Sequence, residues 1–169
     1  MKSIGVYLCF CFLLLLSACS RTHTVLVTYQ TNGGNDIPQT QIHSNSPQWN
    51  PTIPQKEGYL FVHYCVDEAL TLPYSPEDLL NNKQLILYAR WLDPNDQTVV
   101  IVSFVTSGGT YLSSQLISKG DWVVLPPNPT MGTFTFTHWT YYNPDTGLDV
   151  TFDPSKPIME HITLYANYR

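Results

Sequence analysis

The sequence predicts a mostly β protein of the α+β class, with two small modules in tandem after an N-terminal export segment. Three observations support this prediction. First, the 169 residues include 13% aromatics, 13 prolines and nine glycines, a composition that favours short strands separated by turns. Second, the chain matches itself when it is shifted by about 75 residues. Third, the opening segment of each copy alternates apolar and polar residues, which is typical of a half-buried strand.

The first 18 residues have the layout of a secretory signal peptide. Lys2 precedes an apolar run from Ile4 to Leu16, and small residues follow the run. The run is shorter than the roughly 20 residues that a membrane-spanning helix needs, and no later segment approaches that length. We therefore expect residues 1–18 to be removed on export.

The segment Leu-Ser-Ala-Cys at residues 16–19 resembles the bacterial lipobox, in which cleavage leaves a lipid-bearing cysteine at the new N-terminus. This resemblance implies palmitate or a similar acyl chain on Cys19 and a short lipidated tether over residues 19–23. The protein would then sit in the cell membrane or outer membrane and face away from the cytoplasm. The alternative is a secreted protein that is cleaved near Ala18 and keeps Cys19 as an ordinary cysteine.

Charge and cysteine usage exclude several classes of protein. Eight basic and 13 acidic residues give a formal charge of −5, and no basic cluster is present, which argues against nucleic-acid binding. Once the signal peptide is removed and Cys19 is lipidated, Cys65 is the one thiol left, so no internal disulfide can form. Cys65 lies in an apolar run, and we expect it to be a small buried hydrophobic residue.

The first module is expected over residues 24–92. Its opening strand, residues 24–30, points Val25, Val27 and Tyr29 to one face, and the glycine turn after Asn32 reverses the chain into a strand at residues 39–43. The proline-rich residues 47–54 suit an extended crossover rather than a central strand.

The remaining elements of the first module are a third strand, a short helix and a final strand. The third strand is expected at residues 59–66. A helix over residues 75–80 would begin with Ser75 as its N-cap and Pro76 at its first position. The final strand covers residues 85–91.

The second module is expected over residues 98–169, after a linker at residues 93–97 whose composition is that of a turn. It repeats the same order of elements: an opening strand at residues 100–104, a glycine turn, a strand at residues 112–118 and a proline-rich crossover. A third strand at residues 134–142 and a final strand at residues 162–168 complete it. Prolines at 154 and 157 predict that its helix is shorter or absent.

The repeated residues resemble the Listeria-Bacteroides repeat family, which includes the internalin B repeat. The matching motifs are the Tyr-x-Thr-Asn-Gly-Gly turn at residues 29–34, Gly-Tyr-x-Phe at 58–61 and Leu-Tyr-Ala-x-Trp at 87–91, with weaker copies in the second module. The resemblance implies a β-grasp-like fold that is used on cell surfaces, and no catalysis. His63 and His138 replace a glycine of the family, so we expect a β-bulge there, with histidine in the left-handed region.

Signatures of common chemistry are absent from the sequence. The common hydrolase, zinc and nucleotide motifs do not occur, so no catalytic residue, metal site or cofactor is predicted. His63 and His138 could share a metal only if the modules packed face to face. Asn143, Asp145 and Asp149 surround a glycine and suggest either a calcium loop or a plain hairpin turn.

The aromatic residues divide into two groups. Those that recur in both copies are expected in the cores: Tyr29, Phe61, Tyr88, Trp91, Phe104, Phe136, Trp139 and Tyr165. Four others have no aromatic counterpart at the matched position and are expected to be exposed: Trp49, Trp122, Tyr141 and Tyr142. We select Trp122, Tyr141 and Tyr142 as candidate partner-binding residues, because rigid amphipathic rings contribute strongly to recognition.

Three functions remain open from the sequence. The chain could be a surface-exposed binding or adhesion module, with a surface protein or a glycan as its partner. It could instead be a structural or assembly component of the envelope without its own ligand. The third possibility is an enzyme with an unfamiliar site.

Overall fold

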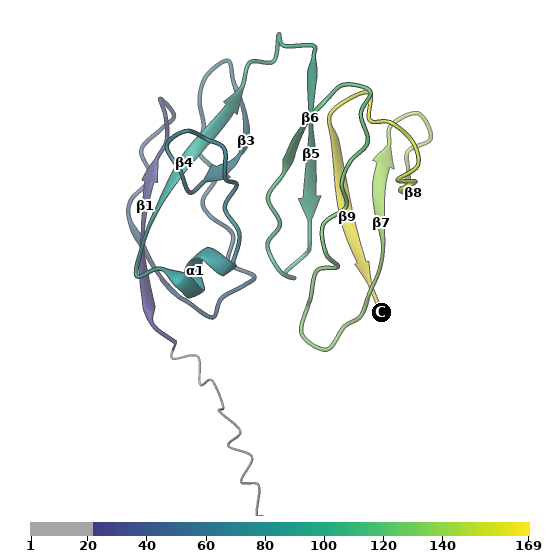
Figure 1. Ribbon diagram of the computed structural model, residues 1–169. Coiled ribbons are helices and arrows are strands. Elements are labelled where there is room, and N and C mark those ends of the chain that lie inside the picture. The colour runs from purple at the N-terminus through teal and green to yellow at the C-terminus, as the bar shows by residue number, and fades with distance from the viewer. Residues whose placement is uncertain (1–21) are drawn as a thin grey trace, which may run out of the picture.

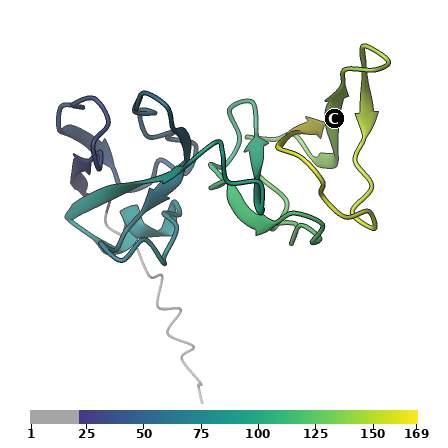
Figure 2. The ribbon, with the colours of Figure 1, turned by 90° about the horizontal axis from the view of Figure 1, so that it is seen from above.

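The computed structural model describes residues 22–169, which form two small sheets side by side (Figures 1 and 2). The expected signal peptide and the lipid attachment site at Cys19 lie outside the described residues. The first sheet contains β1 (Thr24–Gln30), β2 (Thr40–His43), β3 (Leu60–Cys65) and β4 (Gln84–Leu92), with α1 (Glu77–Asn81) between β3 and β4. The second sheet contains β5 (Val99–Val105), β6 (Gln115–Ser118), β7 (Phe136–Asn143), β8 (Leu148–Thr151) and β9 (Ile162–Tyr168).

The two sheets share one topology. The strand order is β2-β1-β4-β3 in the first and β6-β5-β9-β7-β8 in the second. In each sheet the first and last strands of the module, β1 with β4 and β5 with β9, run parallel, and the other neighbours are antiparallel. The sequence prediction of two tandem, mostly β, β-grasp-like modules is therefore confirmed. The second sheet adds β8, a short strand that the sequence analysis did not predict.

The last aromatic residue of each module holds the first turn in place. Trp91 Nε1 donates a hydrogen bond to the carbonyl of Thr31 (2.8 Å), and Tyr168 Oη donates to the carbonyl of Thr106 (3.1 Å). Gly34 must be a glycine because a Cβ there would lie 2.8 Å from the Trp91 ring. The repeated turn and the repeated final aromatic thus form one structural unit.

Both modules contain the expected bulge in the third strand. The register shifts between Phe61 and His63 in β3, and at the equivalent place before His138 in β7. The prediction that these histidines adopt a left-handed backbone conformation is wrong, because neither His63 nor His138 has a positive φ. The bulge is formed by the additional residue in the strand, and it needs no special backbone angle from the histidine.

The helix of the first module starts slightly later than the sequence predicts. Pro76 is the N-cap, rather than Ser75, and it makes no side-chain capping bond. Instead the Asp78 carboxylate accepts a hydrogen bond of 2.8 Å from the backbone N–H of Ser75, which anchors the chain before the first turn. In the second module the equivalent residues, 153–157, form turns and no helix, as expected.

Each sheet has its own apolar core on one face. Alternating residues of β1 and β4 fill the first core, and the equivalent residues of β5 and β9 fill the second. Cys65 is fully buried, as predicted, and burial raises the pKa of its thiol to about 11.

Four of the aromatic assignments are wrong. Tyr141, expected to be exposed, is half-buried and packs on the second core. Tyr165 is 41% exposed and Tyr88 lies outside the core clusters. Each sits between two buried neighbours on its strand, and strand alternation turns its ring to the opposite face. Trp49, expected to be exposed, is half-buried and packs edge-on against Tyr74 at 6.0 Å between ring centroids.

Candidate functional site

The two modules are docked through a small apolar contact. Val62, the additional residue at the β3 bulge, is buried with Leu92 against Ile101 of β5. Val99 and Leu116 pack on the same cluster. At the equivalent bulge of the second module the matched residue is Thr137, which is exposed. The same backbone feature therefore makes the docking contact in one module and stays on the surface in the other.

Hydrogen bonds across the boundary fix the orientation of the modules. His63 Nδ1 donates to the carbonyl of Ser114 at 2.7 Å, and the Ser113 hydroxyl donates to the carbonyl of Tyr74 at 2.6 Å. The backbone N–H of Tyr111 donates to the carbonyl of Pro47 at 2.9 Å. These contacts bind three separate segments of the first module to the second, so the pair is held as one body.

His63 is the one of the repeated pair of histidines that lies in the boundary. It is 2% exposed, and its Nε2 atom is buried without a hydrogen-bond partner. Burial is the main cause that lowers the pKa of His63 below its ordinary value. The Arg90 charge adds to this effect, while the bond to Ser114 opposes it. His138 is exposed on β7 and contacts Thr137 instead, so the structure does not bring the two histidines together as a shared site.

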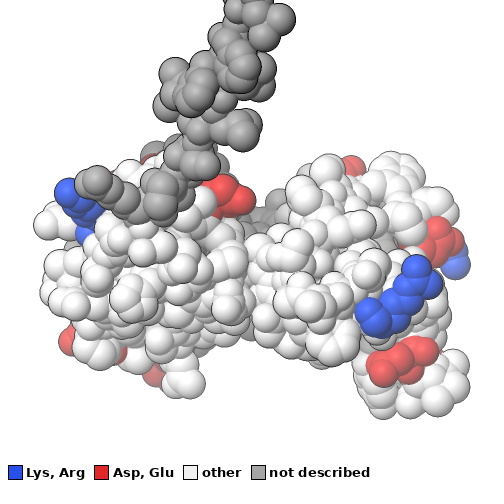
Figure 3. Space-filling model, turned by 90° about the horizontal axis from the view of Figure 1, so that it is seen from below, with Lys and Arg blue, Asp and Glu red and all other residues white. Residues whose placement is uncertain are grey.

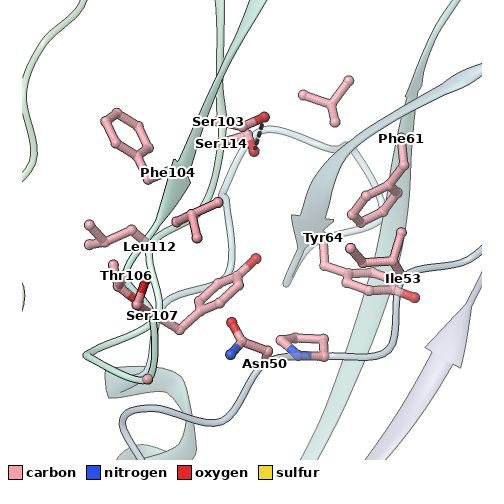
Figure 4. A pocket seen from close by; sticks show the side chains of 15 residues that line it. Asn50, Ile53, Phe61, Tyr64, Ser103, Phe104, Thr106, Ser107, Leu112 and Ser114 are labelled. Atoms are coloured by element: carbon pink, nitrogen blue, oxygen red, sulfur yellow. Dashed lines mark hydrogen bonds between the residues drawn. The ribbon is translucent and has the colours of Figure 1, made fainter. Parts of the chain in front are cut away.

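A cavity of about 490 Å³ opens between the modules (Figure 4). Phe61, Tyr64 and Ile53 of the first module line one side of it. Leu112 and Phe104 line the other side, with the Phe104 ring turned away toward the second core, and the Ser103 and Ser114 hydroxyls lie at its edge, 3.3 Å apart. We call it the junction cavity. Its size falls within the range of ligand pockets. Sequence reasoning could not find it, because its walls come from strands and loops of both modules, which meet only when the modules dock.

Tyr141 and Tyr142, two of the three predicted site residues, lie together at the end of β7. Tyr142 is 57% exposed, whereas Tyr141 is half-buried and packs against the second core. Both line a hollow of about 640 Å³ beside the β7–β8 hairpin, which we call the hairpin hollow. Glu160, His161 and Tyr165 contribute to the same hollow.

Trp122, the third predicted residue, occupies a different place. Its ring is 58% exposed, and its Nε1 donates a hydrogen bond to the carbonyl of Ser155 at 3.0 Å. It does not line the hairpin hollow. The structure therefore brings together two of the three predicted residues. Tyr165 also lines the hairpin hollow. Because Leu164 and Ala166 on either side of it are buried, strand alternation could have placed its ring on the outer face.

The calcium-like segment forms a hairpin turn. The Asn143 Oδ1 accepts a hydrogen bond of 2.9 Å from the backbone N–H of Asp145, and Gly147 has a positive φ of 68°. This turn joins β7 to β8. Across residues 22–169, no three His, Cys, Asp or Glu side chains gather closely enough to hold a metal ion.

Basic side chains do not line the junction cavity or the hairpin hollow among the described residues. Seen from below, most of the molecular surface is uncharged, and the basic and acidic groups are small and separate (Figure 3). Since no Lys or Arg of residues 22–169 lines them, neither hollow is suited to a phosphate or carboxylate ligand. In this same part of the chain, no helix has the length and hydrophobicity that a membrane crossing requires.

Two proteins of Evansella cellulosilytica are similar to this chain. One carries the name "Putative membrane protein" and is 29% identical over 142 residues, which is 84% of this chain and 20% of that protein. The other, "Putative Gly-rich membrane protein", is 29% identical over 143 residues, again 84% of this chain and 16% of that protein. The chain thus spans about a fifth or less of the length of these curated relatives.

A family profile matches both modules. The Listeria-Bacteroides repeat domain aligns with residues 26–90 and again with residues 101–167, which together are more than half of the chain. The two matched segments correspond to the two sheets, β1–β4 and β5–β9. This chain belongs to the Listeria-Bacteroides repeat domain family, of which it contains two tandem copies.

Proposed function

We propose that this chain is a cell-envelope binding module, anchored by a lipid on Cys19, that contacts its partner through exposed aromatic rings of the second repeat. The observation that carries the proposal is the exposure of Tyr142 and Trp122, at 57% and 58%. Neither has an aromatic residue at the matched position of the first repeat. Large aromatics that serve no core are typical of contact surfaces.

A lipid anchor at Cys19 is consistent with a binding surface on the second repeat. The signal-like segment ends at a lipobox-like cysteine, and the similar proteins of Evansella cellulosilytica carry membrane-protein names. β1 begins at Thr24, so the four residues between it and Cys19 can span only about 14 Å when extended. The first repeat would therefore lie close to the bilayer. The second repeat, which lies beside the first, would be separated from the anchor by the width of that module (Figure 1).

The anchor is tested by Cys19→Ala. The wild-type protein is expected in the membrane fraction after a high-salt wash, with labelled palmitate incorporated, because acyl chains add roughly 0.8 kcal/mol of membrane affinity per buried CH₂. The variant is expected in the soluble fraction without label. Membrane retention of labelled Cys19→Ala would show that the anchor lies elsewhere.

The binding surface is tested with serine variants of the three aromatics. Tyr142→Ser and Trp122→Ser are expected to keep the thermal midpoint of the wild type and to lose capture of envelope material from the producing cells. Tyr141→Ser is the comparison, because its half-buried ring packs on the second core and its loss should lower the midpoint. A stable Tyr142 and Trp122 double variant with unchanged capture would contradict the proposal and favour a structural role in the envelope.

A further inference from the structure

The junction cavity and the hairpin hollow are linked by a third hollow that adjoins both, and we call the three together the groove. The third hollow is smaller, about 280 Å³. It shares Phe61 and Ser103 with the junction cavity, and it shares His161, Ile162 and Thr163 with the hairpin hollow. The groove therefore runs from the boundary of the modules across β5 and β9 to the end of β7.

The groove alternates rings with hydroxyl groups. Phe61 stands at one end, and Tyr165 and Tyr142 stand at the other. Between them lie the hydroxyls of Ser103 and Thr163, on residues that are paired across β5 and β9. This pattern offers stacking surfaces at intervals, with hydrogen-bonding groups between them.

His161 adds a hydrogen-bond donor, because a backbone contact of its Nδ1 atom determines which ring nitrogen carries the proton. The backbone N–H of Ile101 donates to His161 Nδ1 at 3.0 Å. A neutral imidazole with Nδ1 as acceptor carries its proton on Nε2, so this exposed ring, which lines the groove, has an N–H donor available. This donor suits a hydroxyl or ether oxygen of a ligand.

Two further observations narrow the ligand class. The described residues along the groove include no Lys or Arg, while Glu160 and Asp145 stand at the hairpin end, so an anionic polymer would be repelled there. The central strand β9 is hydrogen-bonded to β5 on one side and to β7 on the other. In the part of the groove formed by β5, β9 and β7, no sheet edge is therefore open for a peptide to add as a strand.

We propose that this groove binds a neutral polysaccharide chain. A sugar chain presents apolar C–H faces that can stack on rings and hydroxyl edges that can bond to Ser, Thr and His, and it needs no cation. This inference rests on the proposed binding function and names the ligand class for the part of that surface that includes Tyr142. Trp122 lies outside the groove and takes no part in it.

The test is affinity electrophoresis of residues 20–169 in gels that contain dextran, glucomannan, mixed-linkage β-glucan or arabinoxylan, with heparin and polylysine as charged comparisons. Retardation by at least one neutral polymer and not by heparin is expected. Tyr142→Ala and Tyr165→Ala should each weaken the interaction by about tenfold or more, which corresponds to about 1.4 kcal/mol per tenfold. Phe134→Ala is the matched control, because that ring is 58% exposed but lies away from the groove, and it should have no effect.

Three results would overturn the inference. The first is the absence of retardation by every neutral polymer, and the second is retardation that the two tyrosine variants leave unchanged. The third is capture of an envelope protein that depends on Tyr142 while no polysaccharide binds. In that third case the proposed binding function stands and only the ligand class fails. If neither a polysaccharide nor an envelope protein binds, the proposed binding function is contradicted as well.

Discussion

Protonation of His63 should weaken the docking of the two modules. The imidazole is 2% exposed, its Nδ1 donates to Ser114, and its Nε2 is buried without a partner. Adding a proton to Nε2 therefore places a cation in an apolar boundary, beside the Arg90 charge that already lowers the pKa of His63. Lowering the pH should therefore destabilise the contact between the modules before it destabilises either core.

The sign and size of the effect follow from proton linkage. Because the pKa of His63 is lower in the folded chain than in the unfolded chain, the unfolded chain binds the proton more readily below about pH 6.5. The stabilisation is fully present above that pH. It decreases as the pH falls toward the folded pKa, by up to about 1.4 kcal/mol per pH unit for one proton.

The assay is urea unfolding of residues 20–169 at pH 7.5, 6.5 and 5.5, compared with two variants. His63→Asn keeps an N–H near the Nδ1 position and cannot titrate, so its stability should fall less with acid than that of the wild type. His138→Asn changes the matched but exposed histidine, and it should follow the wild-type profile. Equal pH profiles for all three proteins would refute the reasoning about His63.

Two further predictions concern the repeated core. Phe61→Ala and Phe136→Ala should each cost about 3 to 5 kcal/mol in urea unfolding, because each ring packs against the tryptophan of its own core at 5.6 Å and 5.2 Å between centroids. Fully stable variants would show that these rings contribute little to either core. Gly34→Ala should lower stability by about 1 to 3 kcal/mol, because the new Cβ would meet Trp91 at 2.8 Å and the Gln55 carbonyl at 3.0 Å. An unchanged thermal midpoint would mean that the turn relaxes freely.

Most of the fold was predictable because its signals are local or repeated. The alternation of Val25, Val27 and Tyr29 identified β1, and the glycine turn followed from residues that now have positive φ, Asn32 and Gly33. β8 was missed because its four residues, Leu-Asp-Val-Thr, have no counterpart in the first module and carry only one half-buried side chain. A strand that short is specified by its hairpin partner more than by its own sequence.

The site was only partly predictable. Lack of an aromatic counterpart correctly marks Tyr142 and Trp122 as exposed. It fails for Trp49, whose ring packs against Tyr74, and for Tyr141, whose ring packs on the second core. Repetition in both copies predicts burial, and this prediction is wrong for Tyr165, which lies on the outer face of its strand. The boundary of the modules depends on contacts between distant segments, such as His63 with Ser114, and no local pattern encodes them.

Residue-resolved NMR would show directly whether the second repeat carries the binding surface. Uniformly ¹⁵N-labelled residues 20–169 would be titrated with solubilised envelope material from the producing cells. Amide shift changes are expected along the outer face of β7 and β9, including Tyr142, Thr163 and Tyr165. Changes confined to β1 and β2, or no changes at saturating envelope material, would contradict the claim that the second repeat carries the binding surface.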